Sequence, residues 1–336
     1  MTTVSTANPI GVLLANVGTP EAPTAAAVRR YLAEFLSDPR IVDYPAWLWK
    51  PFLFGVLLRF RPRRSARLYQ RVWTDRGSPL ALGMKAIQQG LWERLEQFHP
   101  QRYQVAIGMR YGVPHIRQAL DEFLNAGIER IFVLPLFPQY SGTTTGSVYD
   151  AVFAALAGRR TIPELRTVNH YYDHPGYLDS IAASIRANWQ AGPPDKLVIS
   201  FHGIPARYER SGDPYRAQCV TTAEQVASRL GLPDSAWVMT FQSKFGPERW
   251  LEPATDSTLS ELGKAGAHSV DVVCPGFAVD CLETIDEIGH EGRLSFTQSG
   301  GKVYRYLPAL NAAVPQIDLL QDIVNKNTMD WLGQQP

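Results

Sequence analysis

Cysteines and long apolar runs are both scarce in this chain of 336 residues. The three cysteines are Cys219, Cys274 and Cys281, and no two of them form a Cys-x-x-Cys pair. Three cysteines cannot build a disulfide framework, and they fall short of the four ligands of an all-cysteine zinc or iron–sulfur site. The longest mostly apolar run, Trp47–Leu58, is shorter than the ~20 residues that span a bilayer. We therefore expect a reducing compartment and no membrane-spanning helix.

An excess of either charge is also missing. The 33 Lys and Arg residues against 32 Asp and Glu leave a net charge of +1, whereas a dedicated nucleic-acid binder needs a basic excess. The distribution is uneven, because Arg29–Arg76 holds eleven Lys and Arg but four Asp and Glu. Met1–Asn8 lacks the basic region of a secretory signal. We expect a cytoplasmic protein that does not bind nucleic acid.

Phosphate-binding fingerprints do not occur either. The sequence contains neither a Walker A motif nor GxGxxG, which disfavours nucleotide-triphosphate and dinucleotide chemistry. The segment Gln139–Gly146 follows a predicted strand and opens a helix, as an anion-binding helix N-terminus does. Ordinary N-capping explains this segment equally well.

Short β-rich runs alternate with longer amphipathic patterns, which is typical of βαβ units around a parallel sheet. The predicted strands are Ile10–Ala15, Gln104–Ile107, Arg130–Leu134, Leu165–Val168, Lys196–Ser200, Trp237–Thr240 and Ser269–Val273. The predicted helices are Leu80–Phe98, His115–Asn125, Gly146–Ala157, Tyr177–Trp189, Pro214–Leu230, Asp256–Ala265 and Val314–Trp331. We expect an α/β protein of two halves, residues 1–160 and 161–311, with a last helix at 312–333 that crosses back to complete the first half.

One histidine stands where a predicted strand gives way to a turn. His202 follows the apolar run Leu197–Ile199 and precedes a Gly-Ile-Pro turn. Ligands of open α/β sheets bind beyond the carboxyl ends of the strands, where an imidazole can accept a proton or bind a metal near neutral pH. Taken alone, His202 is better explained as a structural residue. His170 and His174, which also follow a predicted strand, show that one histidine is not sufficient evidence.

The run Asp280–Glu291 is strongly acidic and contains no Lys or Arg. Glu283, Glu287 and Glu291 are spaced four residues apart, so they line one ridge of a helix, where like charges repel. We call these three glutamates the ladder. A solvated acidic helix face explains them as well as a functional role does. The functional alternative is a path that moves divalent cations inward or protons outward.

The segment Tyr44–Arg71 combines dense aromatic and aliphatic side chains with an arginine-rich flank. A buried helix followed by a basic loop is one explanation. We favour an apolar lip that touches an anionic membrane surface through residues 47–67, with the arginines reaching headgroups or substrate carboxylates.

Trp250 lies on a loop shaped by glycine and proline rather than in a periodic segment. Aromatic side chains on loops are more often packing lids than ligand contacts. A flat aromatic ligand would reverse that preference.

Seven segments, in order, together resemble one known family, the ferrochelatases in their Gram-negative bacterial form. They are Leu13–Pro20, Arg76–Leu80, Gly108–Gly112, Pro138–Ser147, Ser200–Pro205, Gln242–Pro253 and Cys274–Glu287. The resemblance implies two Rossmann-like lobes, each with a parallel four-stranded sheet flanked by helices (the chelatase fold), around a porphyrin cleft. It implies insertion of Fe²⁺ into protoporphyrin IX, with release of two protons, to form protohaem. The alternatives are a non-catalytic porphyrin or haem carrier, and a chelatase for coproporphyrin III or for cobalt and a corrin precursor.

The resemblance also implies roles for particular residues. His202 and Glu283 correspond to the family's catalytic pair, associated with metal binding and proton removal, and Glu287 and Glu291 fall on its acidic relay. The positions matched to the porphyrin pocket are Val17, Tyr69, Ser78, Arg110, Tyr111 and Trp250, of which Tyr69 and Ser78 match polar contacts at the propionate end.

Two departures from some relatives refine the expectation. After Cys281 the chain has no cysteine, so we predict no iron–sulfur cluster, no permanently bound cofactor, and Fe²⁺ only as a substrate. Position 281 is a histidine in some members, which puts a metal role for Cys281 in doubt. We expect a cytoplasmic monomer, peripheral to the inner membrane.

Overall fold

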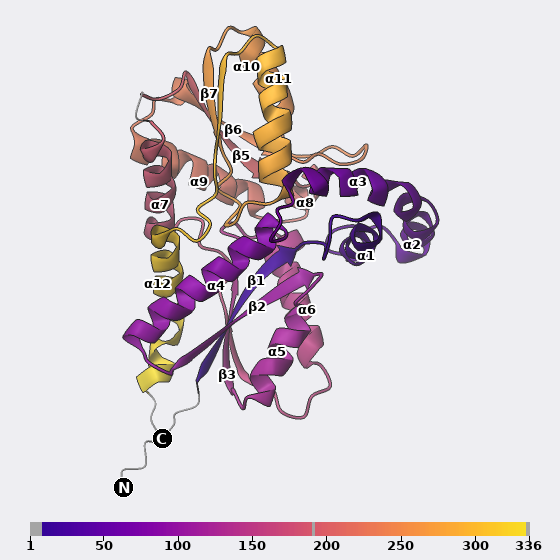
Figure 1. Cartoon of the computed structure of the whole chain (residues 1–336), viewed down its shortest axis with the longest axis vertical. Coiled ribbons are helices and arrows are strands. Elements are labelled where there is room, and N and C mark those ends of the chain that lie inside the picture. The colour runs from indigo at the N-terminus through magenta and orange to yellow at the C-terminus, as the bar shows by residue number, and fades with distance from the viewer. Residues whose placement is uncertain (1–8, 190–191, 334–336) are drawn as a thin grey trace.

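Two parallel four-stranded sheets form the centre of the computed structural model, which describes residues 9–189 and 192–333 (Figure 1). The first sheet has the order β2-β1-β3-β4 and consists of β1 (Ile10–Gly18), β2 (Tyr103–Tyr111), β3 (Arg130–Pro135) and β4 (Glu164–Thr167). The second has the order β6-β5-β7-β8 and consists of β5 (Lys196–His202), β6 (Trp237–Gln242), β7 (Ser269–Val273) and β8 (Val303–Leu307). The predicted α/β class is confirmed.

Helices flank both sheets. Those of the first half are α1 (Ala25–Phe35), α4 (Pro79–Phe98), α5 (Ile116–Asn125) and α6 (Ser147–Leu156). Those of the second are α7 (Pro175–Ala187), α8 (Ala206–Arg210), α9 (Tyr215–Leu230), α10 (Thr255–Lys264) and α11 (Arg293–Gln298), the last continuous with the π-helix η4 (Glu283–Gly292). The central strands β1 and β5 are buried on both faces, as parallel strands between helical layers must be.

The expected boundary at residue 160 falls one strand too early. β4 pairs with β3, with Leu165 opposite Ile131, so it belongs to the first sheet rather than to the second half. The physical reason is the short connection after α6, which returns the chain beside β3 as the next parallel strand. The crossing between the halves therefore lies after Thr167.

The C-terminal helix α12 (Val314–Gly333) runs back beside α4 and β3 (Figure 1). It buries Trp331, whose Nε1 donates to Glu164 at 2.9 Å and whose ring lies under the guanidinium of Arg166. Burying one such large apolar side chain contributes roughly 1.5–3 kcal/mol. The helix thus ties the end of the chain to the first sheet.

A helical projection leaves the first half sideways (Figure 1). It is built from α2 (Ala46–Phe52), the π-helical turn η1 (Leu53–Leu57) and α3 (Leu58–Val72), and we call residues 44–71 the lip. No helix among the described residues is long and apolar enough to cross a bilayer.

Candidate active site

His202 lies at the carboxyl end of β5 and is half-buried. Its Nδ1 is 2.6 Å from the carbonyl oxygen of Gly203. Because a carbonyl oxygen can only accept, Nδ1 carries the proton, and in the neutral ring Nε2 keeps its lone pair. The predicted position at a strand end is confirmed, and the fixed tautomer leaves Nε2 as a proton acceptor or metal ligand.

Gln242 joins His202 to the acidic segment. It is the last residue of β6, stands opposite His202 in the sheet register, and is 3% exposed. Its Nε2 donates to the carbonyl oxygen of Glu283 at 3.0 Å, and its Oε1 accepts from Ser200 at 2.9 Å. Gln242 is not among the predicted site residues, although its position just after a predicted strand is a signal for it.

The acidic run forms the π-helix η4, on which the Glu287 side chain is half-buried. Its two carboxylate oxygens accept from the backbone N–H and the hydroxyl of Ser243, both at 2.6 Å. Burial raises the pKa of Glu287, while the Ser243 hydrogen bonds and the nearby His202 oppose that rise. Glu287 is therefore a carboxyl group within electrostatic reach of His202, and Ser243 is a further residue that sequence reasoning missed.

The outer end of the ladder is paired with the lip. Glu291 accepts from Arg71 Nη1 at 2.8 Å, and the buried Asp286 lies 3.4 Å from the same nitrogen. The predicted repulsion along the ridge is thus reduced by a guanidinium that comes from α3, more than 200 residues away in the sequence. The ladder runs from the half-buried Glu287 to the exposed Glu291.

Glu283 faces a group of buried hydroxyl and thiol side chains. Burial, followed by the charge of Glu283, raises the pKa of the Tyr31 hydroxyl, and burial together with Tyr31 and Glu283 raises that of Tyr69. Burial and then Glu283 also raise the pKa of the Cys281 thiol. All three groups therefore stay protonated at neutral pH. Tyr69 is 9% exposed, and its contact at the propionate end of a porphyrin stays a prediction.

Trp250 lies beside His202, with ring centroids 6.4 Å apart. The loop that carries it is held by a bridge between Pro205 and Trp250. Its indole Nε1 is buried and has no hydrogen-bond partner in the structure. An unpartnered buried N–H costs free energy, and Trp250 carries that cost beside His202.

The first half contributes a network centred on Asp38, which follows α1 and is 5% exposed. Its Oδ2 accepts from Ser147 Oγ at 2.5 Å, Arg110 Nη2 at 2.5 Å and the Tyr111 hydroxyl at 2.7 Å. Burial alone would raise the pKa of Asp38, but the hydrogen bonds and the charge of Arg110 lower it. Tyr111 is 1% exposed, so it supports this network from within, and its predicted contact with a porphyrin stays a prediction.

The remaining predicted pocket residues lie near the ends of β1 and β2. Val17 is half-buried at the end of β1, between two parts of the apolar core. Ser78 is 4% exposed and hydrogen-bonds to Thr19 at 2.9 Å, so its hydroxyl is turned inward rather than toward a ligand carboxylate. Arg110, Val17 and Trp250 keep partly exposed side chains, and their contact with a porphyrin stays a prediction.

The glycine-rich turn at Gln139–Gly146 is already occupied by a carboxylate of the protein. Ser141 caps the turn by accepting from Thr143 N at 3.1 Å. The Asp213 carboxylate, from the second half, accepts from Gly142 N and from Ser141 Oγ, each at 2.8 Å. The N-capping explanation is therefore correct, and the turn fastens the two halves together.

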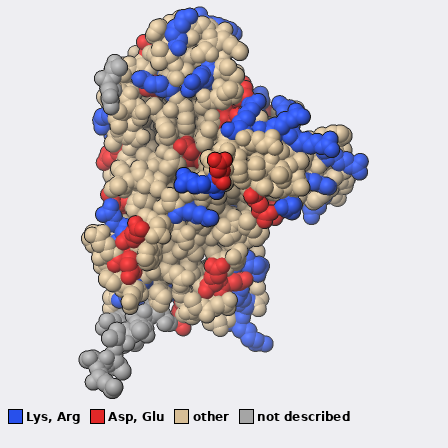
Figure 2. Space-filling model, in the orientation of Figure 1, with Lys and Arg blue, Asp and Glu red and all other residues tan. Residues whose placement is uncertain are grey.

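The lip exposes most of its apolar side chains, as the favoured interpretation requires. Trp47 is 78% and Phe60 74% exposed, and Phe52 and Phe54 are close to half exposed. Trp49 differs, because it packs inward and donates from Nε1 to the Leu36 carbonyl at 2.6 Å. Lys and Arg side chains gather over the same projection (Figure 2).

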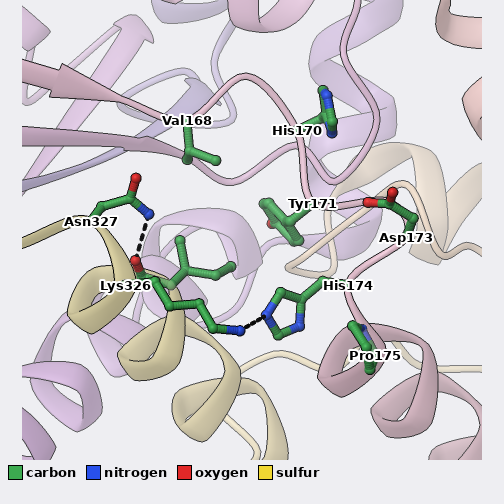
Figure 3. Close-up of a pocket in the computed structure, with 9 residues that line it drawn as sticks. Val168, His170, Tyr171, Asp173, His174, Pro175, Lys326 and Asn327 are labelled. Atoms are coloured by element: carbon green, nitrogen blue, oxygen red, sulfur yellow. Dashed lines mark hydrogen bonds between the residues drawn. The ribbon is translucent and has the colours of Figure 1, made fainter.

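His170 and His174 lie elsewhere, in a pocket between the segment after β4 and α12 (Figure 3). His174 Nδ1 accepts from Gly176 N at 3.2 Å, and its Nε2 lies 3.1 Å from Lys326 Nζ and 3.0 Å from the Asp322 carboxylate, both on α12. His174 thus caps α7 and pairs with α12. Within residues 9–189 and 192–333, no cluster of three or more His, Cys, Asp and Glu side chains is arranged to hold a metal, and His202 Nε2 and the Glu283 carboxylate remain the candidate donors.

Known proteins resemble this chain over almost its full length. A family model described as Ferrochelatase matches residues 9–328. The ferrochelatase of Nitrosococcus oceani is 50% identical over 323 residues, which is 96% of this chain and 88% of that protein. The ferrochelatase of Thioalkalivibrio sulfidiphilus is 49% identical over 328 residues, 97% of this chain and 89% of that protein. These matches include both sheets and the candidate site.

Solved structures resemble the fold. SirB from Bacillus subtilis with Fe3+ superposes with a TM-score of 0.56 at 12% identity, covering 96% of this chain and 97% of that one. The sirohydrochlorin chelatase SirB from Bacillus subtilis subspecies spizizenii in complex with cobalt also gives 0.56, at 11% identity, covering 97% and 98%. At these identities the likeness concerns the fold alone.

Proposed function

The chain belongs to the ferrochelatase family, and we propose that it inserts Fe²⁺ into protoporphyrin IX to form protohaem. The reaction replaces two pyrrole N–H protons by one Fe²⁺, so iron keeps its oxidation state and two protons must leave. The site therefore needs a metal ligand or proton acceptor next to a route by which protons reach water. We assign both to the second half of the molecule.

The observation that carries this assignment is the fixed tautomer of His202. Nδ1 is held by the Gly203 carbonyl, so Nε2 presents a lone pair near the acidic π-helix. A neutral imidazole takes up a proton near physiological pH. His202 takes a pyrrole proton or ligates the incoming Fe²⁺, and Glu283 is its carboxylate partner.

Glu287 is the next acceptor for the proton. Its buried carboxyl group has a raised pKa, which favours transient protonation, and its oxygens are held by Ser243. Glu291 follows at the exposed end of the same helix. The order from His202 to Glu287 to Glu291 leads from the half-buried site to solvent.

The pocket favours a distorted macrocycle over a flat one. In a flat porphyrin the nitrogen lone pairs point inward, so a pocket complementary to a bent ring lowers the barrier to metal entry. Val17, Arg110 and Trp250 are the residues we assign to its wall.

The lip gives the enzyme a peripheral contact with an anionic membrane. Its exposed aromatic side chains suit the boundary between headgroups and acyl chains, and its arginines suit anionic headgroups. The variant Trp47→Ser/Phe60→Ser should lose co-sedimentation with vesicles that contain phosphatidylglycerol. Trp49 is not a suitable target because its replacement also removes a packing contact. The paired control is Phe98→Ser, which is 57% exposed on α4, outside the lip.

The activity is tested by anaerobic incubation with Fe²⁺ and protoporphyrin IX, followed by absorbance. We expect the free-base bands to be replaced by those of protohaem. A carrier would shift the porphyrin spectrum without metallation. A chelatase for another pair of substrates would prefer coproporphyrin III, or cobalt with a corrin precursor, in competition assays.

A further inference from the structure

One loop holds both sides of the candidate site. Residues 243–253, which we call the 243–253 loop, supply Ser243 to Glu287 at one end and Trp250 to His202 at the other. Backbone hydrogen bonds fix the second end, with Leu251 N donating to Ile204 O at 3.0 Å and Ala206 N to Arg249 O at 2.9 Å. A movement of this loop would therefore change the contacts that it makes with Glu287 and with His202.

Arg207 connects this loop to the root of the lip. It lies on α8, five residues after His202, and both of its terminal nitrogens hydrogen-bond to the two carboxylate oxygens of Asp43. Its Nε donates to Glu248, which belongs to the 243–253 loop. Its guanidinium also lies over the ring of Tyr44, the first residue of the lip, at 5.6 Å. A planar guanidinium is suited to such a double carboxylate contact, which lysine cannot reproduce.

Two further contacts join the same parts. The guanidinium carbon of Arg61, on α3, lies 4.0 Å from the ring centroid of Phe245 in the 243–253 loop. The hydroxyl of Tyr208 donates to the Ile41 carbonyl at 3.1 Å, beside the Arg207 contact. The lip is thus fastened to the 243–253 loop at its root and along α3.

We propose that Arg207 is a positioning residue that makes the lip and the 243–253 loop move as one body over the porphyrin. It touches neither the proposed macrocycle nor the reacting atoms, and it acts through Asp43 and Glu248. The proposal rests on the proposed function for the identity of the ligand. A lip held to the loop that carries Trp250 encloses the macrocycle, whereas a lip freed from it lets the macrocycle dissociate.

Binding and loop order are linked in both directions. We call the arrangement in which Arg207 joins the lip to the 243–253 loop the latched arrangement. If it holds the porphyrin more tightly, then the bound porphyrin must favour it by the same factor. Porphyrin should therefore slow amide hydrogen exchange in residues 44–71 and 243–253 together. Without Arg207 the two segments should respond separately.

The test compares Arg207→Gln with the parent by hydrogen exchange and by porphyrin fluorescence quenching. We expect faster exchange in both segments without ligand, a Kd for protoporphyrin IX that rises about fivefold, and a kcat within twofold of the parent. Arg207→Lys should recover little, because lysine keeps the positive charge but lacks the planar guanidinium that contacts both carboxylate oxygens of Asp43. Arg210→Gln, an exposed residue of the same helix, is the matched control and should change none of these values.

Asp43→Asn removes the same contact from the other side and decides the question even if Arg207→Gln does not fold. The double variant should be no worse than Arg207→Gln alone, since Arg207→Gln already removes the contact with Asp43. Unchanged exchange in the 243–253 loop, or an unchanged Kd, would overturn the proposal. Exchange needs no turnover, so a parent that fails to insert iron would refute the function and still leave the latch testable.

Discussion

The two halves share one strand order but use the polar groups at the ends of their strands differently. In the first half Asp38 collects hydrogen bonds from Arg110, Tyr111 and Ser147 and forms a closed network. In the second half His202 keeps a free lone pair on Nε2, and the Trp250 indole N–H has no partner. The same architecture thus supplies a rigid wall on one side and reactive groups on the other.

The pKa values of two buried carboxyl groups express this difference. Burial disfavours ionisation of both Asp38 and Glu287, yet the pKa of Asp38 is lowered and that of Glu287 is raised. Asp38 has a guanidinium in direct contact as well as two hydroxyl donors, whereas Glu287 has donors from Ser243 alone. The hydroxyl and backbone donors around Asp38, together with the charge of Arg110, outweigh its burial, whereas the Ser243 donors and the nearby His202 do not outweigh the burial of Glu287.

The largest expected effect comes from removing the reactive nitrogen of the second half. His202→Ala should lower the rate of Fe²⁺ insertion about 10³-fold, within the usual range for a lost acid–base group. Porphyrin binding and the free energy of unfolding should change little. His170→Ala is the control, because His170 is exposed and lies in another pocket. Insertion within tenfold of the parent would remove His202 from its assigned role.

Breaking the closed network of the first half should affect stability instead. Asp38→Asn leaves Arg110 beside a neutral amide, and we expect the free energy of unfolding in urea to fall by about 3 kcal/mol. Asp150→Asn is the matched control, because its pair with Arg40 is exposed on both sides and should be worth less than ~1 kcal/mol. Equal losses in the two variants would show that the Asp38 network is no more than a surface ion pair.

The pH dependence of that loss has a definite sign. The folded pKa of Asp38 is lowered, so its stabilisation is complete above the unfolded value of 3.8 and disappears as pH falls through the lower folded value. The difference between the parent and Asp38→Asn should therefore be constant near neutral pH and shrink in acid.

The strands were predictable because local pattern decides them. Apolar runs bounded by turn residues identified seven of the eight described strands, and the Gly-Ile-Pro turn after β5 placed His202 at a strand end. β8 was missed because Val303–Leu307 is a partly exposed edge strand containing a charged residue. α1 was missed as well, although Thr24 caps it through Ala27 N, a signal that the sequence contained.

The supporting residues of the site were not predictable from local pattern. Asp38 and Ser147 are 109 positions apart, and Arg71 and Glu291 are 220 apart, so nothing near either residue indicates its partner. The tautomer of His202 likewise depends on how the chain turns at Gly203. Residue types at strand ends indicate where chemistry occurs, whereas the long-range contacts that orient those residues exist only after folding.

A smaller loss of activity is expected at the partner carboxylate. Glu283→Gln keeps the shape of the side chain and removes the charge beside Tyr31 and Cys281, and insertion should fall about 10²-fold, at the lower end for acid–base groups. Glu291→Gln is the control, because Glu291 is half exposed and paired with Arg71. If Glu291→Gln costs more than Glu283→Gln, the reactive end of the ladder has been assigned to the wrong residue.

The smallest effect on the free energy of unfolding is expected at Glu287, and it takes the form of a dependence on pH. The folded pKa of Glu287 is raised, so between the ordinary value of 4.5 and the folded value the native state holds a proton that the unfolded state has lost. Stability therefore falls as pH rises through this window.

Glu287→Gln should remove this slope with little other cost. Its Oε1 can still accept from Ser243 N, and its Nε2 can donate to the Ser243 hydroxyl, which rotates to accept. Urea unfolding of the parent and the variant from pH 4 to 8 measures the difference, which should grow in favour of the variant with rising pH and then level off. Parallel curves would mean that the pKa of Glu287 is not raised and that Glu287 ionises as an exposed carboxyl group does. The contrast between the pKa shifts of Asp38 and Glu287 would then be wrong.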